Sequence, residues 1–327
     1  MHAPAPLRIG TRGSALALTQ ANGVADRLRA LGVAVGIETI TTRGDASVQG
    51  PVATLGGDGV FVRELERALL EGRIDVAVHS LKDLPTAETP GLALACVPER
   101  ATPFDVLVGR TAPTLAALPP KAVVGTSSIR RVVQVRALRP DVVVRPIRGN
   151  VDTRLRRLDA GECDALVLAG AGLERLGLAG RVTEVLRPDA FWPAVSQGAL
   201  GLQSRADDAR TLAAVAQLDH AASHAAVVAE RACLAALAGG CLAPIGGWAR
   251  MGASRGLVLG ACVLEEADGV VHRLGGEGAI PCDEGNDVSI AAAGELGRRV
   301  AADLLARGAA LMLARARGGG ESGNGTT

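Results

Sequence analysis

The segment Gly239-Gly240-Cys241-Leu242-Ala243-Pro244-Ile245-Gly246 places a thiol between two glycines and a proline-glycine bend. Glycines free the backbone and Pro244 fixes it, so we expect Cys241 to lie on a tight turn after a helix over 220–237. A thiol presented on such a turn can contact a ligand. The competing interpretation is a small buried apolar side chain at a helix end.

A second group of polar residues, His79-Ser80-Leu81-Lys82-Asp83, leaves the apolar strand 74–79 for a loop that ends at Pro85. A carboxylate there can accept a hydrogen bond from a substrate N–H and stabilise a developing cation, which makes Asp83 the candidate catalytic residue. Lys82 could form a Schiff base if its pKa were lowered, although a structural ion pair is the simpler interpretation. We expect the ring of His79 to be hydrogen-bonded.

Arginines recur at the turns that follow predicted strands. Backbone N–H groups and the helix dipole at such turns favour anions, and a guanidinium adds bidentate recognition of carboxylate or phosphate. A single arginine of this kind is more often a solvated surface residue. Their recurrence along one sheet edge predicts a ligand with several negative charges, and the arginines concerned are Arg12, Arg130, Arg131, Arg148, Arg154 and Arg175.

Hydrophobic periodicity predicts two α/β domains, each with a parallel sheet and helices on both faces. In the first we expect strands at 7–11, 33–40, 74–79 and 92–97, and helices at 15–31, capped by Ser14, and 60–71. In the second we expect strands at 104–108, 122–125, 142–145 and 165–168, and helices at 152–160, 171–176 and, capped by Ser127 or Ser128, up to Leu138.

We expect the chain to return to the first domain near 196–201, so that ligands lie at the carboxyl ends of the strands in a hinged cleft. The remainder predicts a small α+β domain, with strands at 247–251, 256–264 and 270–277 and a helix at 287–307. The expected domains are 1–100 with 195–219, then 101–194, then 220–315, followed by a disordered tail at 316–327.

Composition narrows the classes of partner. The 327 residues are 48% hydrophobic and 21% charged with a net charge of +1, which gives no general attraction to nucleic acid or membranes. Aromatic residues make up 2% and tyrosine is absent, so base stacking has almost no side chains to use. The six cysteines lack CxxC and zinc-type spacing, so we predict neither a metal site nor disulfides. Without a signal peptide or an apolar span, a cytoplasmic protein is expected. The charged helices and the polar tail predict a monomer.

Seven motifs, in order along the chain, resemble the hydroxymethylbilane synthases, also called porphobilinogen deaminases. They are Arg8–Leu18, Gly56–Leu65, Val78–Pro85, Gly125–Arg131, Arg148–Val151, Ser196–Gly201 and Gly239–Gly246. The resemblance covers nearly the whole chain. It implies two doubly wound α/β lobes similar to type II periplasmic binding proteins, followed by a small C-terminal α+β domain.

The resemblance also implies a reaction. Members of this family join four porphobilinogen molecules head to tail, release ammonia each time and free the linear tetrapyrrole hydroxymethylbilane with water. The growing chain starts on a dipyrromethane cofactor held by a thioether, and the cysteine that matches the attachment residue is Cys241. A soft thiolate suits this link. The matching aspartate, Asp83, is implied to accept hydrogen bonds from pyrrole N–H groups and to assist proton transfer.

Each pyrrole carries an acetate and a propionate, which the arginines would bind. By motif match the cofactor is implied to contact Arg130, Arg131, Arg154, Lys82, Asp83, Ser80, Thr126 and Ser128. The substrate and the elongating chain are implied to contact Arg12, Arg148, Arg175, Ser14, Gln20, Gln197 and Phe61.

One segment departs from the family pattern. Many relatives carry lysines in the loop before the helix at 60–71, whereas this chain has Thr54 and Asp58 there. Asp58 would repel a polyanion if the loop closed over it. We therefore expect loop closure to matter less here, or Arg43 or Arg63 to take the place of the lysines.

Two other functions fit parts of the pattern. A non-catalytic two-lobed anion-binding protein would show similar lobes and arginines, but it leaves the Cys241 turn and the third domain without a role. A Schiff-base enzyme using Lys82 would likewise leave Cys241 unused, and trapping with borohydride in the presence of substrate would reveal it.

Overall fold

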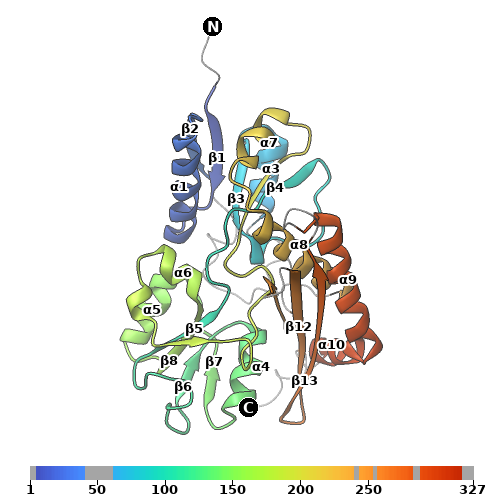
Figure 1. Cartoon of the computed structure of the whole chain (residues 1–327). Helices are drawn as coiled ribbons and strands as arrows, with labels where there is room; N and C mark the ends of the chain where they lie inside the picture. The colour runs from blue at the N-terminus through green and yellow to red at the C-terminus, as the bar shows by residue number, and fades with distance from the viewer. Residues whose placement is uncertain (1–4, 41–61, 239–242, 253–255, 283–287, 319–327) are drawn as a thin grey trace. The chain divides into compact units, whose positions relative to one another are not determined.

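The computed structural model describes residues 5–40, 62–238, 243–252, 256–282 and 288–318, which form helices and three sheets (Figure 1). The chain divides into two units. Unit 1 consists of Met1–Ala101 and Gly198–His224, and unit 2 of Thr102–Gln197 and Ala225–Thr327. Each unit therefore contains two separate stretches of the chain. The division of unit 2 into two domains remains a prediction.

A five-stranded sheet with the order β2-β1-β3-β10-β4 forms the centre of unit 1. Its strands are β1 (Leu7–Thr11), β2 (Val35–Thr39), β3 (Val76–Ser80), β4 (Leu92–Cys96) and β10 (Leu200–Arg205). β1 pairs in parallel with β2 and β3, whereas β10 runs antiparallel between β3 and β4. The expected parallel sheet is thus mixed, because the returning strand enters it from the opposite direction.

Helices cover both faces of this sheet, as expected from its alternating apolar residues. Val76 and Val78 point to one face, where they pack with α1 (Ala15–Ala30) and with residues of and just after α7 (Ala209–Ala216). Ala77 points to the other face and packs with α3 (Arg63–Leu70). Ser14 caps α1 as predicted, since its hydroxyl accepts a hydrogen bond from the Ala17 N–H at 3.3 Å.

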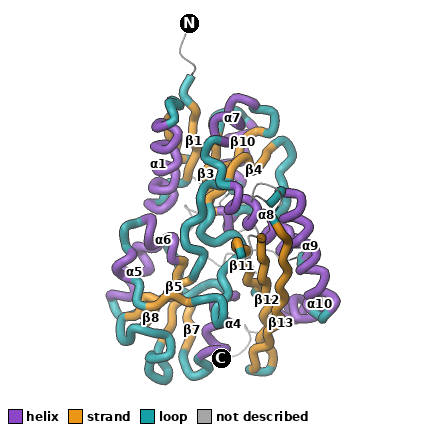
Figure 2. The backbone as a smooth tube through the Cα atoms, viewed as in Figure 1, coloured by secondary structure: helices purple, strands orange, loops and turns teal. Residues whose placement is uncertain are grey.

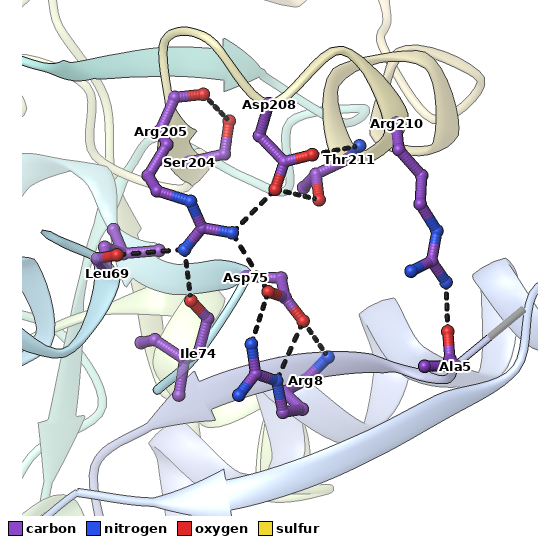
Figure 3. A network of polar contacts seen from close by, with 10 residues as sticks. All are labelled: Ala5, Arg8, Leu69, Ile74, Asp75, Ser204, Arg205, Asp208, Arg210 and Thr211. Carbon is purple, nitrogen blue, oxygen red and sulfur yellow. Dashed lines mark hydrogen bonds and ion pairs between the residues drawn. The ribbon is translucent and has the colours of Figure 1, made fainter. Parts of the chain in front are cut away.

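An ion-pair network fastens β10 to the amino ends of β1 and β3 (Figure 3). The Arg205 guanidinium lies 3.0 Å from Asp75 and 2.6 Å from Asp208, and it donates to the carbonyls of Leu69 and Ile74. Arg8 contacts the same Asp75 carboxylate at 2.7 Å. Burial acts to raise the pKa of Asp75, but hydrogen bonds from Arg8 and Arg205 outweigh it and lower that pKa to about 2.

Unit 2 repeats this arrangement in a sheet with the order β7-β6-β8-β5-β9. Its strands are β5 (Asp105–Gly109), β6 (Val123–Gly125), β7 (Val143–Arg145), β8 (Ala165–Ala169) and β9 (Glu184–Leu186). β6 is parallel to β7 and β8, and β5 runs antiparallel between β8 and β9. In both sheets, therefore, the fourth position is taken by an antiparallel strand, which in unit 1 is the distant β10 and in unit 2 is β5, the strand directly before β6 in the chain.

Alternation along β5 and β8 again creates two cores. Leu107 and Val167 pack with α4 (Ile129–Leu138) on one face, and Val106 and Leu166 pack with α5 (Val151–Asp159) and α6 (Gly170–Arg175) on the other. Ser128 is the N-cap residue of α4, one of the two residues expected, but its side chain makes no capping hydrogen bond. The Ser127 hydroxyl makes a tertiary contact, donating to the Ile147 carbonyl at 2.8 Å.

The C-terminal part of unit 2 is a three-stranded antiparallel sheet of β11 (Ile245–Met251), β12 (Gly256–Ala267) and β13 (Val270–Pro281). One face packs with α8 (Ala221–Ala236), α9 (Ile290–Ala306) and α10 (Ala309–Gly318). On the other face Cys262 and Leu264 meet Val133 of α4, which lies beside β12 in Figure 2. The sequence did not predict α10.

The α/β fold class expected from the sequence, with two α/β sheets and a smaller α+β part, is confirmed. Among the residues that the structure describes, no helix has both the length and the apolar character needed to cross a bilayer. The five described cysteines are free thiols.

Candidate active site

In unit 1, the predicted polar residues gather at the carboxyl ends of β1 and β3. Arg12 directly follows β1, and Ser14 and Gln20 lie at the cap and in the second turn of α1. Ser80 is the last residue of β3, and its hydroxyl lies 3.0 Å from the buried amide nitrogen of Gln20. This contact joins the two βα connections, so the sequence correctly placed these residues at one sheet edge.

Asp83 and Lys82 lie in a 3₁₀ turn, Leu81–Asp83, immediately after β3. The buried Leu81 anchors the turn, because its N–H donates to the Ala199 carbonyl at 3.0 Å. The Asp83 side chain is exposed and Lys82 is half-buried. His79 is buried with its Nε2 3.1 Å from the Gln203 side-chain oxygen, as predicted. The fold therefore presents Asp83 to solvent on a rigid support.

In unit 2, the strongest electrostatic feature is a buried group of one carboxylate and two arginines. Asp105, with no solvent exposure, lies 2.8 Å from Arg130 Nη1 and 2.7 Å from Arg131 Nη2. Arg130 and Arg131 are only 4% and 6% exposed. Asp105 starts the antiparallel strand β5 and lies opposite Ala169, the last residue of β8. The three charges thus lie at the carboxyl edge of the sheet.

These charges do not cancel. Burial acts to raise the pKa of Asp105, but the adjacent Arg130 and Arg131 outweigh it and lower that pKa to about 2. Burial lowers the pKa of Arg130, although Asp105 acts in the opposite direction. Two cations with one anion leave a net positive charge out of contact with water, which favours binding of an anionic ligand.

The other predicted residues of unit 2 lie in the segments that follow its parallel strands β6, β7 and β8. Thr126 is buried after β6, and its hydroxyl accepts a hydrogen bond from the Ser128 N–H at 3.4 Å. Arg154 donates to the Gly149 carbonyl at 2.7 Å, and the neighbouring Arg148 is exposed. Arg175 ends α6 half-buried, and burial lowers its pKa.

Gln197 was predicted to contact substrate, and the structure gives its side chain several protein partners. Its amide nitrogen lies 3.0 Å from Asp105 and 2.8 Å from the Pro103 carbonyl, and its oxygen lies 3.4 Å from Arg131. Gln197 has no solvent exposure. It therefore supports the carboxylate that holds the arginines.

Cys241 and Phe61, and the loop residues Arg43, Thr54 and Asp58, lie outside the described residues. Cys96, Cys163, Cys233 and Cys262 are buried, and burial raises the pKa of each thiol, to about 12 for Cys96 and Cys233. Only Cys282 among the described cysteines is partly exposed. In the part of the chain that the structure describes, no cluster of His, Cys, Asp and Glu could hold a metal ion.

Sequence reasoning missed three buried polar residues of unit 2. Asp105 pairs with both arginines, Gln134 holds the backbone of Trp192, and Glu230 accepts from the backbone N–H groups of Ser196 and Ala249. The sequence offered one indication of the role of Asp105, namely that it is a charged residue at the start of the apolar strand β5. No pattern in the sequence indicated the other two.

The two α/β sheets and the buried, net positive group at a strand edge define an α/β protein with a group of charges suited to an anionic ligand. Family models cover almost all of the chain. The porphobilinogen deaminase dipyrromethane cofactor binding domain matches residues 7–213, and the porphobilinogen deaminase C-terminal domain matches residues 224–306. The chain belongs to the porphobilinogen deaminase family.

Two relatives that are porphobilinogen deaminases agree with this assignment. The porphobilinogen deaminase of Mycolicibacterium paratuberculosis is 47% identical over 97% of this chain and 100% of its own length. That of a Roseiflexus species is 52% identical over 75% of this chain and 82% of its own length. Among solved structures, the chain is similar to the methionine-binding protein MetQ, with a TM-score of 0.42 and 14% identity over 65% of this chain and 89% of that one.

The family assignment makes the chain a transferase of porphyrin and tetrapyrrole biosynthesis that uses a dipyrromethane cofactor. It decides against the non-catalytic anion-binding protein that the sequence had left open.

Proposed function

We propose that this chain is a hydroxymethylbilane synthase, which joins four porphobilinogen molecules head to tail, releases ammonia at each step and frees the linear tetrapyrrole with water. The observation that carries this function is the buried Asp105–Arg130–Arg131 group, whose net positive charge matches a chain of pyrroles bearing acetates and propionates. It lies in a chain whose family models and relatives are porphobilinogen deaminases.

The donor set fits a dipyrromethane with its several carboxylates. Arg130 and Arg131 supply guanidinium groups held rigidly by Asp105, and Arg154 supplies a third at the start of α5. Hydroxyl and ammonium donors from Ser80, Lys82, Thr126 and Ser128 complete the set that would hold it. When bound, the dipyrromethane supplies the pyrrole carbon to which the first substrate is joined.

Cys241 is the thiol to which we assign the thioether. A thioether forms from an accessible thiolate, and burial with a raised pKa removes four of the other thiols from competition. Cys282 is partly exposed and lies, like Cys241, within the family's C-terminal match, but only the glycine-rich turn of Cys241 is the family motif.

Asp83 is the proposed catalytic residue. Its exposed carboxylate at the end of β3 can accept hydrogen bonds from the N–H groups of a pyrrole and stabilise the cation formed as porphobilinogen loses ammonia. The same carboxylate can take part in the proton transfers of each condensation. For the substrate and the elongating chain we assign binding to Arg12, Arg148 and Arg175, together with Ser14, Gln20, Gln197 and Phe61.

The experiment that tests this function is the intact mass of the purified protein under denaturing conditions, beside a Cys241→Ser variant. The unmodified chain has a mass of 33.2 kDa. We expect an excess equal to two porphobilinogens less two ammonias, and no excess in the variant. A wild-type protein that stays unmodified after incubation with porphobilinogen would overturn the proposal.

We further infer a monomer in the cytoplasm, with three domains at 1–100 with 195–219, at 101–194 and at 220–315. The charged helices and the polar tail support a monomer. Light scattering during size-exclusion chromatography tests this, with 33.2 kDa expected.

A further inference from the structure

One short segment of unit 2, Trp192–Gln197, contacts both the arginine pair and the strand that follows the cofactor-attachment turn. We call it the bridging segment. On one side its backbone is bound by α4. The Trp192 N–H donates to the Gln134 side-chain oxygen at 2.6 Å, and the Gln134 amide donates back to the Trp192 carbonyl at 3.0 Å. Arg130 also donates to that carbonyl.

On its other side the bridging segment hydrogen-bonds to β11 and packs against it. The Pro193 carbonyl accepts a hydrogen bond from the Gly247 N–H at 3.0 Å. Trp192 lies so close to Gly246 that a Cβ atom on Gly246 would be 2.4 Å from the Trp192 Cβ. Only glycine fits there. Gly246 is five residues after Cys241 in the sequence.

A buried carboxylate reinforces this contact. Glu230 of α8 has no solvent exposure and accepts from the Ser196 N–H at 2.5 Å and from the Ala249 N–H at 2.8 Å. It therefore ties the bridging segment and β11 to one helix. Ser196 has a φ of +60°, a left-handed conformation that is uncommon for a residue other than glycine. The next residue, Gln197, contacts Asp105 and Arg131.

We propose that the bridging segment positions the covalent cofactor, with Gln134 as a positioning residue. This rests on the proposed function. A ligand attached at Cys241 and bound by Arg130 and Arg131 is held at two places. The bridging segment contacts both β11, the strand that follows Cys241 in the sequence, and α4, the helix that carries the two arginines. Gln134 acts through the backbone: its side chain fixes Trp192, whose carbonyl also accepts a hydrogen bond from Arg130. Misplacement by about 1 Å can cost roughly a hundredfold in rate.

The first test compares Gln134→Leu with Gln203→Leu. Both glutamines are buried, 2% and 5% exposed, and each bonds other groups through its amide, but Gln203 belongs to unit 1 and the bridging segment to unit 2. Apoenzyme is incubated with porphobilinogen, and loading is followed by intact mass. We expect Gln134→Leu to load at least roughly tenfold more slowly and Gln203→Leu to load within about twofold of wild type, at similar losses of Tm.

A second pair of variants tests the inference even if Gln134→Leu does not fold. Gly246→Ala forces Trp192 to move, whereas Gly275→Ala in the same sheet places its Cβ no nearer than 3.9 Å to other atoms. We expect slow loading and changed tryptophan fluorescence for Gly246→Ala alone. Loading at the wild-type rate in both Gln134→Leu and Gly246→Ala would overturn the inference. A wild-type protein that gains no mass would instead overturn the proposed function.

Discussion

Asp105 and Arg131 form a fully buried ion pair, with Oδ1 of the aspartate 2.7 Å from Nη2 of the arginine. The aspartate begins β5 and the arginine lies in the first turn of α4, so the pair joins two elements that the sequence separates. Arg130 shares the carboxylate at 2.8 Å. The two guanidinium groups are therefore held in place by the protein alone, which lowers the entropy cost of ordering them on a ligand.

Replacing Asp105 by Asn should destabilise the protein strongly. It leaves two buried guanidinium groups without a counter-charge, and breaking a buried ion pair in this way costs about 3–5 kcal/mol. Urea unfolding at pH 7 measures the change in the free energy of unfolding. Asp26→Asn, which removes only the exposed pair with Arg29, is the control and should match wild type. Equal stability of both variants would contradict the assigned role of Asp105.

Stability should fall between about pH 4 and pH 2. Asp75 and Asp105 both have pKa values lowered to about 2 in the folded protein, below about 3.9 for an unperturbed aspartate. Their contribution is present above the unfolded value and is lost as the pH falls through the folded value, because the unfolded chain then binds more protons. Urea unfolding from pH 7 to pH 2 measures this. The drop should be smaller in Asp75→Asn, and an identical drop would contradict the role of Asp75.

Arg205→Ala should reduce stability without reducing catalysis. Arg205 bonds two carbonyls and two carboxylates at the amino ends of β1 and β3 (Figure 3). Asp83 instead follows the carboxyl end of β3. Loss of charged hydrogen bonds at this partly buried site should cost about 2 kcal/mol or more. Thermal unfolding and kcat are measured in parallel, with Arg29→Ala as an exposed control. A kcat that falls at a temperature where the variant is fully folded would show that the network also affects the active site.

Asp83→Asn should lower kcat by about 10²–10⁴-fold, because the neutral amide can neither stabilise the developing cation nor accept its proton. The side chain is exposed, so Tm should stay near that of wild type. Glu88→Gln, at an exposed carboxylate five residues on, serves as the control. A fall of less than roughly tenfold would remove Asp83 from the catalytic role.

The loop before α3 provides a prediction from sequence alone, since Asp58 lies outside the described residues. A carboxylate there would repel the anionic substrate, so Asp58→Lys should lower KM. Steady-state kinetics at low ionic strength, where screening is weakest, measure the change. A clearly higher KM would rule out the repulsion.

Features set by neighbouring residues were predictable, and those set by distant ones were not. Ser14 caps α1 because its partner is three residues away. The cap of α4 is Ser128 rather than Ser127, whose hydroxyl donates to the Ile147 carbonyl twenty residues on. The arginines could be assigned to strand ends from their spacing, yet their pairing with Asp105 depends on how β5 enters the sheet. Gln134 and Glu230 bind backbone groups, which leave no trace in side-chain patterns.

The placement of β10 delays completion of the first sheet during protein synthesis. Among the strands that the structure describes, β10 is the only sheet partner of β4, and it covers one edge of β3, but it follows them by roughly a hundred residues. At a translation rate of about 5–20 residues per second, the ribosome needs roughly 5–20 s to make that stretch. Throughout this interval the nascent chain carries an unpaired, apolar strand edge, which is a site for chaperone binding and for aggregation.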